Sequence, residues 1–246
     1  VLALVIGLIS VIFLIRSPQD LHQKPLGWEK AEELQKAAAN GTESLAGVDK
    51  KTALHSPSFW LLSAALLCVC SAGSAFMAYA PAWWQMNGMS STQASNWDAL
   101  YLILAGVVLL IVGKVTAKMS PSVFAVIVCA AFVACVFCLV NLGTNPTTML
   151  MLLIVVFGAL AYPLCASIPG LMGQSIFGMK DFAAISATLM TAVYCGQALY
   201  APVMARFLAS QGGMAAGWYF FGGAVVLGLA LILVAIALSP MKKRKA

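Results

Sequence analysis

Four hydrogen-bonding side chains recur at intervals of three in one apolar run of the chain: Thr188, Thr191, Tyr194 and Gln197. On a helix this spacing places them along one broad side. A buried glutamine needs several hydrogen-bond partners, and hydroxyl groups at this spacing can supply hydrogen bonds to a neighbouring helix or to a ligand. We therefore expect the stripe to avoid lipid, and it suits either helix packing or the lining of a cavity.

Two other apolar runs carry hydroxyl-bearing residues close to a proline. Proline removes a backbone donor and leaves a carbonyl unpaired, so a helix bends there or exposes polar backbone. Side chains beside such interruptions are candidates for lining a cavity, although proline and small residues also belong to ordinary helix packing in lipid. The candidates are Ser71, Ser74 and Tyr79 before Pro81 in one run, and Tyr162 and Ser167 around Pro163 in the other.

The residues that most often perform covalent chemistry or bind metals form no recognisable motif. The only two histidines, His22 and His55, lie in one polar segment, and the stretch 106–114 has the wrong spacing for a phosphate-binding loop. All seven cysteines fall within apolar stretches, which predicts small hydrophobic residues and no disulfide framework or ligand cluster. We therefore expect no enzyme, no catalytic or metal-binding residue and no cofactor.

Composition indicates the solvent in which these residues must work. Hydrophobic residues make up 62% of the 246 residues, charged residues make up 9%, and the mean hydropathy is +0.94. The apolar share exceeds the roughly 45–50% of soluble domains, so we expect an integral membrane protein. The net charge of +6 does not indicate nucleic-acid binding, because the basic residues sit between apolar runs without base-reading groups. Strand-like alternation is absent, and the expected fold class is an all-α polytopic membrane protein.

The lengths of the apolar runs predict six complete membrane spans. A hydrocarbon layer about 30 Å thick requires roughly 20 apolar residues per helix. A seventh run, residues 1–15, is too short to span alone and is expected to be the end of a helix whose beginning is missing, so the chain is expected to be a fragment. The predicted spans are residues 58–84, 97–115, 121–142, 147–170, 182–208 and 217–238.

Basic residues predict the orientation of these spans. Threading the spans alternately puts 13 of the 14 lysines and arginines on one side and leaves Arg206 on the other. Basic residues in short loops stay in the cytoplasm, so this side and the basic tail, residues 240–246, are predicted to be cytoplasmic. Orientation is a sufficient role for the tail, and binding of lipid headgroups is the second interpretation. Trp83 and Trp84 lie near the outer end of their span and are expected in the interfacial aromatic belt.

The segment 16–57 holds most of the remaining polarity and is expected to be a cytoplasmic loop. Its residues 27–41 contain good helix formers, an i,i+4 pair of Glu32 with Lys36 and a stop at Asn40-Gly41. This pattern predicts a short surface helix.

Three stretches resemble transporters of the major facilitator superfamily. The sequence "RSPQDLHQKPLG" (16–27) is similar to the segment after helix six in the oxalate/formate antiporter-like and monocarboxylate-transporter-like branches, with His22 in place of a glycine. The sequence "HSPSFWLL" (55–62) resembles the entry to helix seven, and "SIFGMKDFAAI" (175–185) resembles the connection from helix ten to helix eleven. The resemblance implies that residues 1–15 end helix six. It also implies that residues 58–239 are helices seven to twelve, the carboxyl-terminal six-helix bundle of a 12-helix fold.

The resemblance also implies a function. It predicts a secondary active transporter that works by alternating access in the cell membrane, with a missing amino-terminal six-helix half as its partner. The substrate is expected to be a small organic solute, with a monocarboxylate or related organic anion favoured by the resemblance alone. The loop "GKVTAKMS" (113–120) has Ala117 where the family motif has an acid, and no lysine or arginine lies in the middle of helices eight and eleven. This departure argues against a dianion. The alternatives are efflux of apolar or aromatic compounds and, outside transport, a seven-helix receptor or a membrane assembly subunit.

The resemblance finally assigns roles to the polar residues described above. In this superfamily the first helix of each three-helix repeat lines the central cavity, with the second and fifth helices of the bundle supporting it. Buried charge in lipid normally marks function, but no charged residue lies at the centre of a span. Asp98 and Arg206, at the outer ends of helices eight and eleven, are either hydrated or part of an outer gate. The predicted substrate-binding residues are Ser71, Ser74, Tyr79, Tyr162, Ser167, Thr191, Tyr194 and Gln197.

Overall fold

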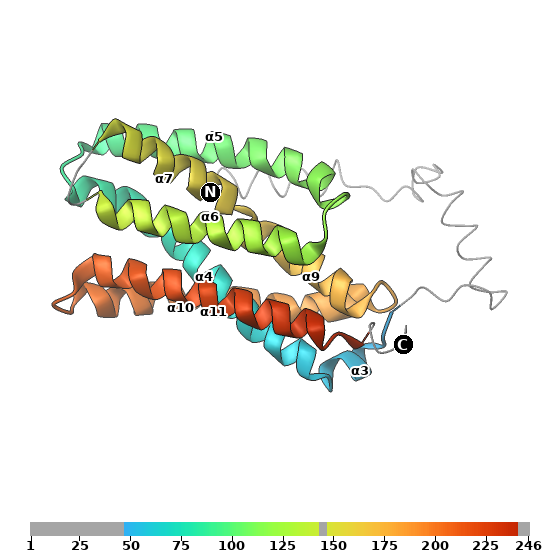
Figure 1. Cartoon of the computed structure of the whole chain (residues 1–246). Coiled ribbons are helices and arrows are strands. Elements are labelled where there is room, and N and C mark those ends of the chain that lie inside the picture. Colours follow the sequence, from blue (N-terminus) through green and yellow to red (C-terminus); the bar gives the residue numbers. More distant parts are fainter. Residues whose placement is uncertain (1–46, 143–146, 241–246) are drawn as a thin grey trace, which may run out of the picture. The chain divides into compact units, whose positions relative to one another are not determined.

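The computed structural model describes residues 47–142 and 147–240. Within these ranges the regular structure is helical, with one isolated β-bridge between Gly47 and Gly178. Six spans of this part of the chain are long and apolar enough to cross a membrane (Figure 1). For these residues the predicted all-α fold, with six helices long and apolar enough to cross a membrane, is therefore confirmed. The predicted end of helix six (1–15), the surface helix (27–41) and residues 241–246 of the tail lie outside the described residues.

The spans of the structure follow the apolar runs closely, and two of them begin at least four residues earlier than predicted. Helix α5 starts at Ser91 because Ser90 forms a capping box, in which its hydroxyl accepts from the Gln93 backbone N–H at 3.2 Å and its own N–H donates to Gln93 Oε1 at 3.0 Å. The last span starts at residue 213 and not at 217. The helices are α3 Lys50–Leu54, α4 Pro57–Met86, α5 Ser91–Thr116, α6 Pro121–Asn141, α7 Thr148–Ala161, α8 Pro163–Ala166, α9 Ile168–Phe177, α10 Phe182–Leu208 and α11 Gly213–Ala237.

The fourth span is interrupted twice, whereas α4 and α10 continue through their internal prolines, Pro81 and Pro202. Helix α7 ends where Pro163 cannot donate to the preceding turn, and the Tyr162 N–H bonds instead to the Ala159 carbonyl at 3.2 Å. A second break falls at Ser167, between α8 and α9. The sequence predicted a bend or exposed polar backbone at Pro81 and Pro163. At Pro163 the span is broken, and together with the break at Ser167 it forms three helices, whereas α4 remains one helix through Pro81.

The six spans form two successive groups of three, and the first helix of each group packs against helices of the other group. The first group is α4, α5 and α6, and the second is the broken span α7–α9 with α10 and α11. Helix α4 packs against α10 and α11 of the second group, α7 packs against α5 and α6 of the first, and the third helices α6 and α11 pack against each other. Each group therefore inserts its first helix between the other two helices of its partner group.

Glycines allow α10 and α11 to approach α4 closely. A Cβ added at Gly196 would lie 2.5 Å from the Leu67 carbonyl oxygen of α4. A Cβ added at Gly228 would lie 2.5 Å from Cγ2 of Val69 and 3.2 Å from the Ala65 carbonyl oxygen. Small residues at helix contacts in membranes have this role, because lipid supplies no hydrophobic force between helices and close packing must replace it.

One end of the six-span unit is held by a short strap, residues 47–50, against the turn between α9 and α10. The Val48 N–H donates to the Phe177 carbonyl at 3.0 Å, next to the bridge between Gly47 and Gly178. Lys180 pairs with Asp49 at 2.8 Å, with both side chains about half exposed. The Lys50 N–H also donates to Asp181 Oδ2 at 2.9 Å. The strap thus fixes the entry to α4 against the start of α10.

Basic residues gather at this same end. Alternation of the spans places five of the six described lysines and arginines there and leaves Arg206 at the opposite end of α10. The five are Lys50, Lys51, Lys114, Lys118 and Lys180.

The two tryptophans near the end of α4 are not exposed to the membrane interface, and the predicted belt role is wrong for them. Trp84 has no exposed surface and Trp83 is 9% exposed. The Trp83 indole N–H donates to the Leu139 carbonyl at 2.8 Å, so the ring packs against α6. A position near a helix end does not say whether a side chain faces lipid or a neighbouring helix, and here both rings face inward.

Candidate functional site

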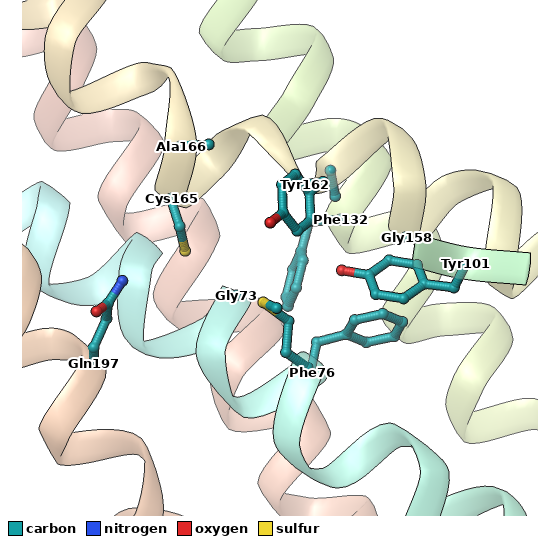
Figure 2. A pocket seen from close by; sticks show the side chains of 11 residues that line it. Gly73, Phe76, Tyr101, Phe132, Gly158, Tyr162, Cys165, Ala166 and Gln197 are labelled. Atoms are coloured by element: carbon teal, nitrogen blue, oxygen red, sulfur yellow. The ribbon is translucent and has the colours of Figure 1, made fainter. Parts of the chain in front are cut away.

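A pocket of about 300 Å³ lies where α4 meets the interrupted span (Figure 2). Its volume is at the lower end of the roughly 300–1,000 Å³ typical of small-molecule sites. Five spans contribute to it, so it forms only when both three-helix groups have packed. We call it the aromatic pocket. It is lined by Gly73, Phe76 and Met77 of α4, Tyr101 of α5, Phe132 of α6, Gly158, Ala161 and Tyr162 at the end of α7, Cys165 and Ala166 of α8, and Gln197 of α10.

Aromatic rings form one wall of the aromatic pocket. Phe76 contacts Tyr101 edge-on at a centroid distance of 5.3 Å and Phe132 at 6.4 Å. Tyr101 in turn lies 6.4 Å from Tyr162 in a similar tilted arrangement. Edge-to-face rings at 4.5–7 Å attract one another, so the wall is a mutually supported cluster.

Two glycines make room for this arrangement. A Cβ added at Gly158 would lie 2.9 Å from Cζ of Phe76, so the ring of Phe76 packs directly on the backbone of α7. A Cβ added at Gly73 would lie 2.6 Å from the sulfur of Cys165. Cys165 also donates to the Cys70 carbonyl at 3.7 Å, which ties the short helix α8 to α4. The sulfur therefore borders the pocket at the point where the span is broken.

Three polar groups face the aromatic pocket. The hydroxyls of Tyr101 and Tyr162 are directed into the space near Gly73 and Cys165, and the amide of Gln197 approaches the same region from α10 (Figure 2). Among the hydrogen bonds of the described residues, none involves these three groups. Pro81 also leaves the Met77 carbonyl without its usual intrahelical donor. Polar groups that face a cavity without a hydrogen-bond partner in the protein can form hydrogen bonds with a ligand.

Of the predicted substrate-binding residues, the structure brings Tyr162 and Gln197 together in the aromatic pocket. Ser71 is buried and donates to the Cys68 carbonyl in its own helix at 2.8 Å. Tyr79 is half-buried and packs edge-on against Tyr200 of α10 at 6.0 Å. These two residues lie outside the pocket lining.

The other four predicted contacts also lie outside the lining. Ser74 and Ser167 are half-buried, one on α4 and the other at the break before α9. Thr191 and Tyr194 are exposed, and 65% of Tyr194 is accessible. Within the described residues the polar stripe of α10 thus reaches the pocket only through Gln197, and its middle part faces outward.

The two residues proposed for an outer gate lie at the same end of the spans, opposite the basic end. Asp98 is half-buried near the start of α5, and Arg206 is exposed near the end of α10. No ion pair joins them in the part of the chain that the structure describes.

Three residues of the aromatic wall were missed by the sequence analysis. Phe76, Tyr101 and Phe132 lie in three different helices and have no shared spacing. Their convergence depends on how each helix is rotated, which an all-round apolar sequence does not reveal.

Comparison with known proteins adds no relative. No protein-family model matches the chain, and no curated protein matches it either. Among residues 47–142 and 147–240, no three His, Cys, Asp or Glu side chains lie close enough to hold a metal ion.

Proposed function

We propose that this chain forms one six-helix half of a secondary active transporter of the major facilitator type, which moves a small organic solute by alternating access. The observation that carries the proposal is the reciprocal packing of the two three-helix groups. The groups are successive and contain an odd number of spans, so their first helices, α4 and α7, enter the membrane from opposite sides. Inverted repeats of this kind, with a site at their junction, are typical of secondary transporters.

The position of the aromatic pocket supports the proposal. It lies between the first helices of the two groups, and one of these helices is broken beside it. Discontinuous helices expose polar backbone only where it lines a cavity or is buried in protein. A pocket at the junction, with a broken helix and unpaired polar groups, is suited to bind a solute that crosses the membrane.

The exposed side of α10 supports the presence of a second helical bundle. Exposed positions on α6 and α11 carry large side chains that suit lipid, such as Phe137 and Leu227. Helix α10 is the least hydrophobic of the six spans, and most of its exposed positions are small or polar. Small and hydroxyl-bearing residues are enriched where membrane helices pack together. The exposed small or polar residues of α10 are Ala183, Ala184, Ala187, Thr191, Tyr194, Cys195, Ala198, Ala205 and Arg206.

The test is solute flux in proteoliposomes that contain the chain together with its partner half, encoded in the same gene or a neighbouring one. Formate, lactate, benzoate and benzamide are offered as radiolabelled solutes, with and without a proton gradient. We expect saturable flux of at least one solute, lowered at least tenfold by Ala166→Trp, which narrows the aromatic pocket from an exposed position of its lining, and unchanged by Tyr219→Phe on the exposed side of α11. Flux of every solute at the level of protein-free vesicles contradicts the proposal.

A further inference from the structure

We infer that the aromatic pocket selects an uncharged solute with an aromatic or apolar body and one polar group that both donates and accepts hydrogen bonds, such as a carboxamide. The inference rests on the proposed function and concerns its substrate class. It departs from the monocarboxylate that the sequence resemblance favours.

The absence of charge from the lining is the first step. Among the residues that the structure describes, no Asp, Glu, Lys or Arg borders the pocket. An ion transferred from water into such a site loses its hydration and gains no opposite charge in return.

The second step is that the polar groups of the pocket include both hydrogen-bond donors and acceptors. Gln197 presents both an amide N–H₂ donor and a carbonyl acceptor, and the hydroxyls of Tyr101 and Tyr162 both donate and accept. A carboxylate only accepts, so it would leave the Gln197 carbonyl unpaired, and an ammonium only donates, so it would leave the N–H₂ group unpaired. Unpaired buried polar groups cost binding energy, whereas a carboxamide or hydroxyl pairs with both kinds of group.

The aromatic wall is the third step. The rings of Phe76, Tyr101, Phe132 and Tyr162 offer faces and edges that suit another ring or a flat apolar body. The pocket volume of about 300 Å³ restricts that body to a small one. A single ring with one polar substituent fits both restrictions.

The test compares three ligands of nearly equal size and different charge: benzamide, benzoate and benzylamine, which are neutral, anionic and cationic at pH 7. Equilibrium binding of each radiolabelled ligand is measured to the whole chain in lipid nanodiscs. We expect saturable benzamide binding that is at least tenfold tighter than binding of either ion. The inference is overturned if benzoate or benzylamine binds as tightly as benzamide, or if benzamide shows no saturable binding.

Two variants connect this selectivity to the pocket. Gln197→Leu and Tyr162→Phe each remove one hydrogen-bonding group and should weaken benzamide binding about five- to tenfold. Tyr194→Phe, on the exposed face of the same helix as Gln197, should leave it unchanged. Unaltered benzamide binding in both pocket variants overturns the inference.

A second measurement uses the unsubstituted chain, so it does not depend on whether a variant folds. In the unaltered chain benzamide should slow maleimide labelling of Cys165, which borders the pocket. Equal labelling of Cys165 with and without saturating benzamide overturns the inference. Selective binding without flux in proteoliposomes would refute the transport proposal alone, and flux of anions in preference to benzamide would refute the substrate class alone.

Discussion

At the scale of single residues, burial and hydrogen bonding separate side chains that the sequence presents as equivalent. Trp83 and Trp84 are neighbours at the end of α4, and both are buried. The Trp83 indole donates to the Leu139 carbonyl at 2.8 Å, whereas the buried Trp84 indole N–H has no hydrogen-bond partner. A buried donor without a partner has lost its hydration without compensation, so the two rings should contribute differently to stability.

We therefore predict that Trp83→Phe destabilises the chain more than Trp84→Phe, by about 1–2 kcal/mol, because both changes remove the same atoms and only the first breaks a hydrogen bond. Thermal unfolding of the two variants in one detergent, followed by circular dichroism, measures the difference. Equal destabilisation, or a greater loss for Trp84→Phe, would show that the bond to Leu139 contributes nothing.

Residue types in the sequence pointed to part of the aromatic pocket. Tyr162 was identified because it precedes a proline, and Gln197 because it ends a polar stripe. Both signals are local. Phe76 and Phe132 were not identified, because each lies among apolar residues that extend around its helix and no residue type marks the side that faces the pocket. In water an apolar stripe marks the buried face of a helix, but in lipid the outer face is apolar too, and this information is lost.

At the scale of helices, the physics of the bilayer made the spans predictable. Every backbone polar group in hydrocarbon must be satisfied within the helix, so the length of an apolar run predicts a span directly. The start of α5 was missed because its first six residues, Ser91 to Asn96, are mostly polar and its first turn depends on the cap at Ser90. The contacts between helices were not predictable in this way, since they depend on a few close approaches.

Gly196 is the closest of these approaches between α10 and α4. In Gly196→Ala the new methyl group would meet the Leu67 carbonyl oxygen, which is backbone and cannot rotate away, so the two helices must separate. We expect a loss of about 2–3 kcal/mol of stability, as for overpacked cores.

Gly223→Ala in α11 is the matched control, because nothing lies within 4 Å of its added Cβ. It should be neutral or slightly stabilising, by up to about 1 kcal/mol, since alanine favours helix over glycine. Thermal unfolding of both variants tests the contact. A Gly196→Ala chain as stable as the Gly223→Ala chain would mean that α10 does not pack on α4 at this distance.

At the scale of the whole molecule, the order of the spans and the distribution of charge together predict the orientation in the membrane. The two groups follow each other in the chain and each has three spans, so their first helices run in opposite directions. Because five of the six described cations lie at the end that carries the strap, the positive-inside rule predicts that this end faces the cytoplasm. Reversing the orientation would require several lysines to cross the bilayer, at about 2.5–3.5 kcal/mol for each residue at the centre of a span.

This orientation predicts which loops are accessible from outside the cell. Ser90→Cys and Ser210→Cys place a thiol in the connections from α4 to α5 and from α10 to α11, at the end with few cations. A membrane-impermeant maleimide should label both in intact cells. Ser120→Cys, in the connection from α5 to α6, should be labelled only after the membrane is permeabilised. The unsubstituted chain measures background, because its seven cysteines lie within the helices. Labelling of Ser120→Cys but not of Ser90→Cys in intact cells would show the opposite orientation, with the basic end outside the cell.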